Sequence, residues 1–124
     1  MRTLVFIGVG GMFGSIARYL TGQFFSKYLS LTLPVGTLAV NLVGAFLIGI
    51  IIGLGERHQW FTEPWHFFLA VGFCGSFTTF STFAYENYEL MREGHIGTLI
   101  FYVSFSLIAG SLLAWGGYEL SKLV

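Results

Sequence analysis

"GFCGSFTTFSTFAYENYE", residues 72–89, places five serine and threonine hydroxyls and four phenylalanines in one short stretch of this sequence. The sequence on either side of it is almost entirely hydrocarbon, so this concentration of hydrogen-bonding groups needs an explanation. Gly72 and Gly75, followed by Thr78 and Thr79, are residues that weaken an α-helix. Because polar groups without partners are costly in apolar surroundings, the hydroxyls of this stretch must bind to something.

The composition of the whole chain is that of an integral membrane protein. Hydrophobic residues make up 55% of the 124 residues, charged residues only 10%, and the mean hydropathy is +0.76. A membrane-spanning helix needs about 20 apolar residues, so this length permits four crossings with short linkers. We therefore predict an all-α membrane protein with a single transmembrane domain, residues 1–124, and a third helix broken near mid-membrane. The helices are expected at about 3–25, 33–55, 65–88 and 96–118.

Several other classes of protein are not indicated by the sequence. Six basic residues balance six acidic residues, so no excess of charge points to nucleic acid or to an acidic partner. Cys74 is the only cysteine and lies in an apolar run, which leaves no disulfide or chelating pair. The sequence contains no recognisable Ser/His/Asp arrangement, metal-ligand cluster or phosphate-binding loop, so we do not expect an enzyme.

The basic residues are nearly balanced between the two sides that four crossings create. One side carries Arg2, Arg57 and Lys122, and the other carries Lys27, Arg92 and, at the membrane edge, Arg18. Since the Lys/Arg imbalance of short loops sets orientation, this near tie predicts that copies insert both ways up. Two opposed copies would then form an antiparallel, dual-topology homodimer. A single orientation that is set by other features remains the alternative.

Polar and aromatic residues follow the expected break at helical spacing. Thr79, Thr82 and Glu86 fall on one face of a helix, with Ser81 beside them. The two phenylalanines of this segment, Phe80 and Phe83, lie three residues apart on another face. The edges of aromatic rings are positive, so they can face an anion. The alternative is that the rings only pack and that the hydroxyls bond to their own helix.

Asn41 lies near the centre of the second expected helix, in the run "VGTLAVNLVGAFLIG". Its amide can donate two hydrogen bonds, although for such a residue taken alone the commoner role is to bridge two helices. Together with ring edges and hydroxyls, it would form a lining that favours an anion without any fixed charge. Such a lining suits a small, strongly hydrated anion.

Three motifs carry a resemblance to a known family. They are "GGMFGSIARY" at 10–19, "GTLAVNLVG" at 36–44 and "GFCGSFTTFSTF" at 72–83. In these motifs and their order the sequence resembles the Fluc fluoride channels of bacteria over nearly the whole chain. The resemblance implies a four-helix subunit in the bacterial cytoplasmic (inner) membrane and an antiparallel homodimer with two pores. It also implies passive, selective fluoride export that relieves fluoride toxicity.

The resemblance also assigns roles to residues. It implies that Asn41 is a donor in the fluoride pore and that Phe80 and Phe83 flank the path of the ion. The further pore residues that it implies are Thr79, Ser81, Thr82 and, toward the vestibule end, Glu86, with Tyr102 and Ser106 extending the hydrogen-bonding path. Arg18 matches a motif arginine that lends positive potential at the pore mouth, or that extends its charge to the membrane surface.

A bound sodium ion is a further implication of the resemblance. Family members hold Na+ at the centre of the dimer interface with main-chain carbonyls, which here map to Gly75 and Thr78 of both subunits. The chemistry is consistent, because a helix break frees carbonyl oxygens and a hard cation needs oxygen ligands. The partners expected for this chain are therefore a second copy of itself, fluoride and membrane lipid, with sodium as a structural cofactor at the dimer interface.

A small four-helix antiporter of the multidrug type is the alternative function. It would share the length, the helix number and the dual topology, but it would need a carboxylate within the membrane. The first expected helix contains no Asp or Glu, and Glu86, the one acid that could be embedded, lies near the end of its helix. A purely structural subunit is also left open by composition, although it would leave the hydroxyl and aromatic faces without a purpose.

Overall fold

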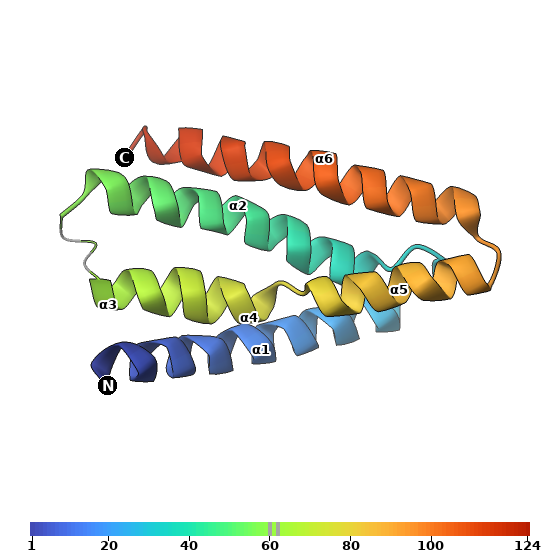
Figure 1. Cartoon of the computed structure of the whole chain (residues 1–124), viewed down its shortest axis with the longest axis horizontal. Helices are drawn as coiled ribbons and strands as arrows, with labels where there is room; N and C mark the ends of the chain where they lie inside the picture. The colour runs from blue at the N-terminus through green and yellow to red at the C-terminus, as the bar shows by residue number, and fades with distance from the viewer. Residues whose placement is uncertain (60, 62) are drawn as a thin grey trace.

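The computed structural model describes residues 1–59, 61 and 63–124 of the chain. Within these residues, four segments are long and apolar enough to span a membrane, as the composition predicted (Figure 1). Three of them are single helices, α1 (Arg2–Tyr28), α2 (Val35–Arg57) and α6 (Ile96–Ser121). The remaining segment is divided into α3 (Glu63–His66), a π-helical segment η1 (Phe67–Cys74), α4 (Gly75–Phe77) and α5 (Phe80–Arg92).

The helices continue a few residues beyond the apolar runs of the sequence. α1 ends at Tyr28 and α2 at Arg57, whereas the apolar runs end near residues 25 and 55. Lys27 and Arg57 lie in the last turns of these helices, where a positive charge interacts favourably with the unpaired carbonyls of the helix terminus. Backbone hydrogen bonding therefore extends the helices into sequence that hydropathy alone assigns to linkers.

The helices pack as two pairs, α2 with α6 and α1 with η1. The two termini lie at the same end of the bundle, together with the end of α2 and the start of α3 (Figure 1). Glycines allow close contact between α2 and α6, because a Cβ atom on Gly49 would collide with the carbonyl oxygen of Ala114. On the other side of this contact, a Cβ atom on Gly117 would collide with the carbonyl oxygen of Phe46. The positions of the two backbones are thus set by residues that have no side chain.

The third crossing is interrupted at Thr78 and Thr79. Thr78 has φ −82° and ψ 160°, and Thr79 has φ −151° and ψ 118°, so both residues have extended backbone. Gly72 and Gly75, which the sequence also suggested as part of the break, lie inside helical segments. Gly72 serves packing instead, since a Cβ atom there would lie only 2.7 Å from the carbonyl oxygen of Ile7 on α1.

Candidate functional site

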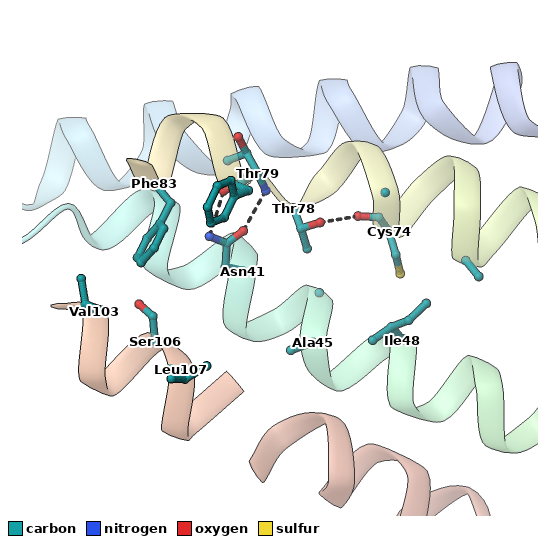
Figure 2. A pocket seen from close by; sticks show the side chains of 14 residues that line it. Asn41, Ala45, Ile48, Cys74, Thr78, Thr79, Phe83, Val103, Ser106 and Leu107 are labelled. Atoms are coloured by element: carbon teal, nitrogen blue, oxygen red, sulfur yellow. Dashed lines mark hydrogen bonds between the residues drawn. The ribbon is translucent and has the colours of Figure 1, made fainter. Parts of the chain in front are cut away.

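Asn41 and Thr79 form a reciprocal pair of hydrogen bonds at the break (Figure 2). The backbone N–H of Thr79 donates to Asn41 Oδ1 at 2.8 Å, and Asn41 Nδ2 donates to the carbonyl oxygen of Thr79 at 3.1 Å. The extended backbone releases both groups of Thr79 from helical bonding, and the side chain of Asn41 satisfies them. Asn41 has two N–H bonds, so one of them remains for another acceptor.

Thr79 is also the N-cap of α5. Its Oγ1 accepts a hydrogen bond from the backbone N–H of Thr82 at 3.2 Å and donates to Thr82 Oγ1 at 3.1 Å. The Ser81 hydroxyl lies 3.4 Å from the same oxygen. Three of the hydroxyls that the sequence singled out therefore meet at the start of α5, where the helix dipole is positive.

Thr78 is bonded to the helix that precedes the break. Its Oγ1 donates to the carbonyl oxygen of Cys74 at 2.9 Å, and its backbone N–H donates to the same oxygen at 3.0 Å (Figure 2). Because the N–H of Thr79 donates to Asn41, it is not the usual helical donor to the carbonyl of Gly75. At the end of α4, the carbonyl oxygen of Gly75 is therefore without its usual helical donor.

An open groove of about 560 Å³ lies beside the break, between α2, η1, the start of α5 and α6. Its polar lining comes from Asn41, Thr78, Thr79 and Ser106, and its aromatic lining comes from Phe80 and Phe83. The rest of the lining is Gly44, Ala45, Ile48, Ala70, Cys74, Gly75, Val103 and Leu107. None of these residues carries a charge. Ser106 lies on α6 across the groove from Asn41, and its buried hydroxyl oxygen has no hydrogen-bond partner among the described residues (Figure 2).

A second cavity, of about 370 Å³, lies between α1, α2 and α5. It is more polar than the groove, and Arg18, Thr79 and Thr82 are among the residues that line it. Thr79 is 8% exposed and lines both spaces. The Asn41–Thr79 pair therefore stands between a cavity that contains a basic side chain and a groove that contains the phenylalanines.

The two phenylalanines have different surroundings. Phe80 is 79% exposed, and its ring centroid lies 6.1 Å from that of Phe83. Phe83 packs against Tyr102, with 4.9 Å between the ring centroids. The same Tyr102 is fully buried and donates a hydrogen bond to Glu86 Oε1 at 3.3 Å. The aromatic and polar faces of α5 thus meet at one residue of α6.

Thr37 is a residue near this site that the sequence analysis did not select. It is close to both Glu86 and Tyr102. It lies one helical turn before Asn41 on α2, so the i, i+4 spacing of two polar residues in an apolar helix was the signal that could have found it.

The arrangement can hold a small anion without a fixed countercharge. The free N–H of Asn41, the hydroxyl of Ser106, unpartnered among the described residues, and the ring edges all present positive partial charge. No group of three or more His, Cys, Asp or Glu side chains that could hold a metal ion is present in residues 1–59, 61 and 63–124. Main-chain carbonyls near the break are the oxygen ligands that a hard cation would find.

Comparisons with known proteins agree over nearly the full length. A family model described as CrcB-like protein, Camphor Resistance (CrcB), matches residues 5–118. A protein from Leptospira interrogans serogroup Icterohaemorrhagiae serovar copenhageni named Fluoride-specific ion channel FluC is 42% identical over 121 residues, covering 98% of this chain and 95% of the relative. A protein of the same name from Azobacteroides pseudotrichonymphae is 35% identical, and the match covers 98% of this chain and 98% of that protein. Another from Vibrio vulnificus is 39% identical, and the match covers 96% of this chain and 94% of that protein.

Proposed function

The chain belongs to the CrcB family, and we propose that it is a fluoride-specific ion channel that exports fluoride passively and so relieves fluoride toxicity. The observation that carries this proposal is the extent of the sequence similarity, since the alignments with relatives named for this function cover 98% of the chain. It is a multi-pass bacterial membrane protein, and an ion channel rather than an enzyme. The antiporter alternative is not favoured, because the relatives are named as channels and α1 contains no carboxylate.

The path that we propose for fluoride follows the two spaces that share Thr79. Fluoride enters the cavity beside Arg18, where positive potential raises the local concentration of anions. It then passes Asn41 and the hydroxyls at the start of α5, and moves along Phe80 and Phe83. Uncharged donors replace part of the hydration shell without binding the ion too tightly for release. The other polar residues of the proposed path are Ser81, Thr82, Glu86, Tyr102 and Ser106.

A second, oppositely oriented copy is part of this proposal. Phe80 is 79% exposed and Gly75 is exposed, so the groove beside the break is open on one side of the subunit. An antiparallel homodimer would cover this side and bring the two breaks close together. Lipid would contact the apolar side chains that remain on the outside of the dimer.

Sodium is the cofactor that we propose for the dimer interface. The carbonyl of Gly75 lacks its usual helical donor, because the N–H of Thr79 donates to Asn41 instead. Thr78, three residues after Gly75, has extended backbone. Carbonyl oxygens of this kind fit a hard cation. Gly75 and Thr78 of both subunits would hold the ion, which would neutralise the negative ends of the carbonyl dipoles at the interface.

Ion flux from liposomes containing the purified protein tests the proposed function. Liposomes loaded with potassium fluoride or potassium chloride are diluted into impermeant buffer with a K⁺ ionophore, which balances the charge, and efflux of each anion is recorded with a selective electrode. We expect fast fluoride efflux and chloride efflux close to that of protein-free liposomes, which also control for permeation by neutral HF. Equal rates for the two anions, or no fluoride efflux above the protein-free level, would contradict the proposal. Uphill accumulation of fluoride under an imposed pH gradient would instead indicate an exchanger.

A further inference from the structure

Gly44 and Thr78 meet beside the helix break. Gly44 lies nearly one turn after Asn41 on α2, and a Cβ atom added to it would collide with the Cγ2 methyl of Thr78. The next-nearest atoms, Cδ1 of Phe77 and Cβ of Thr78, would each lie 3.6 Å away, which is an ordinary van der Waals distance. One methyl group therefore occupies the space that a side chain at position 44 would need.

The Thr78 side chain is held in this orientation by its other branch. Its Oγ1 donates to the carbonyl oxygen of Cys74 at 2.9 Å. Since both branches leave the same carbon, a χ1 rotation that moved the methyl away from Gly44 would also break this hydrogen bond. The hydroxyl of Thr78 is thus bonded to the helix before the break, while its methyl group is seated against α2.

The Gly44 contact differs in kind from the tight contact of Gly49 on the same helix. At Gly49 the obstacle to a Cβ atom is a backbone carbonyl of α6, which no side-chain substitution can remove. At Gly44 the obstacle is the end of one side chain, and a serine at position 78 would remove it while keeping the hydroxyl. The contact is therefore open to a direct test by compensating substitutions.

We infer that Gly44 is a positioning residue of the pore, which seats the Thr78 methyl so that the next residue, Thr79, meets Asn41. Two consecutive residues of the break are then held against one face of α2, Thr78 by shape and Thr79 by hydrogen bonds. A side chain at position 44 would push the break away from α2 and separate Thr79 from Asn41. The predicted effect on flux rests on the proposed function, whereas the contact itself does not.

The experiment compares Gly44→Ala with two double variants, Gly44→Ala/Thr78→Ser and Gly44→Ala/Thr78→Val. Fluoride efflux and the melting temperature in detergent are measured for each variant. The single variant Thr78→Ser is measured as well, because it completes the double-mutant cycle with Gly44→Ala. We expect Gly44→Ala to lower efflux about tenfold or more and to lower the melting temperature. Serine, which lacks the methyl, should restore most of both losses, and valine, which keeps it, should restore neither.

Gly116→Ala is the matched control, since a Cβ atom there would have nothing within 4 Å. It should keep the efflux and the melting temperature of the wild type. A Gly44→Ala variant that behaves like the wild type, or a serine double variant as impaired as Gly44→Ala, would overturn the inference. If Gly44→Ala does not fold, recovery of folded protein by the serine variant still decides it. If the wild type itself carries no fluoride, the proposed function fails, and the melting temperatures alone decide whether the two residues are coupled.

Discussion

The side chain of Asn41 and the backbone of Thr79, which are 38 residues apart in sequence, satisfy each other at the helix break. The side-chain amide of Asn41 replaces the two backbone groups that Thr79 would bond in a continuous helix. Because only Oδ1 can accept from the N–H of Thr79, these bonds fix the orientation of the amide. One N–H of Asn41 is left over. Asn41 therefore satisfies the free backbone groups at the break and still has one N–H that can donate to an ion.

Asn41→Asp should reduce fluoride efflux more than the replacement of Phe80 or Phe83 does. The new carboxylate can still accept from the N–H of Thr79, but it cannot donate to the carbonyl oxygen of Thr79, and it places an anion in the proposed path. An unsatisfied buried acceptor costs about 1–3 kcal/mol, and charge repulsion adds to this. We expect efflux to fall more than about a hundredfold, measured on variants that elute like the wild type in size-exclusion chromatography. Efflux near the wild-type rate would remove Asn41 from the pore.

Phe80→Ile and Phe83→Ile should separate an electrostatic role of the rings from simple packing. A volume-similar apolar exchange usually costs under about 1.5 kcal/mol of stability. If ring edges help to replace the water around fluoride, efflux should drop strongly in both variants while the protein still assembles. Wild-type efflux from both folded variants would show that these rings only pack.

Gly117→Ala should destabilise the protein, whereas Gly116→Ala should not. A Cβ atom at position 117 would collide with the carbonyl oxygen of Phe46 on α2, but one at the adjacent position would meet nothing within 4 Å. Overpacking of this kind costs about 1–3 kcal/mol. The melting temperatures of the two variants in detergent measure the difference. Equal melting temperatures would mean that α2 and α6 are not held at this close distance.

Copies of the chain should insert in both orientations. The near tie of basic residues between the two sides provides little bias, so a tag at the C-terminus should be labelled from either face of the membrane. Leu31→Lys adds one basic residue to the linker at the opposite end from the C-terminus, and it should shift the population toward an external C-terminus. Labelling of every wild-type molecule from one face would rule out the antiparallel dimer.

The four crossings could be predicted from the sequence because the property that makes them is local. About 20 consecutive apolar residues are enough to favour a helix in a membrane, whatever the rest of the chain does. The break in the third crossing was also visible as threonines that follow glycines. Its exact place was not, because Gly72 and Gly75 both stay helical and Gly72 packs closely against α1.

The sequence by itself therefore determined the membrane class, the number of crossings and the residue types available beside the break. Only the tertiary structure decided which groups satisfy one another: Thr79 is bonded by Asn41, the methyl of Thr78 fills the space beside Gly44, and Tyr102 binds Glu86 while it packs on Phe83. The physical reason is that these partners lie on different helices. Their distances depend on how closely the backbones approach at glycine contacts, and no local pattern of residues encodes that approach.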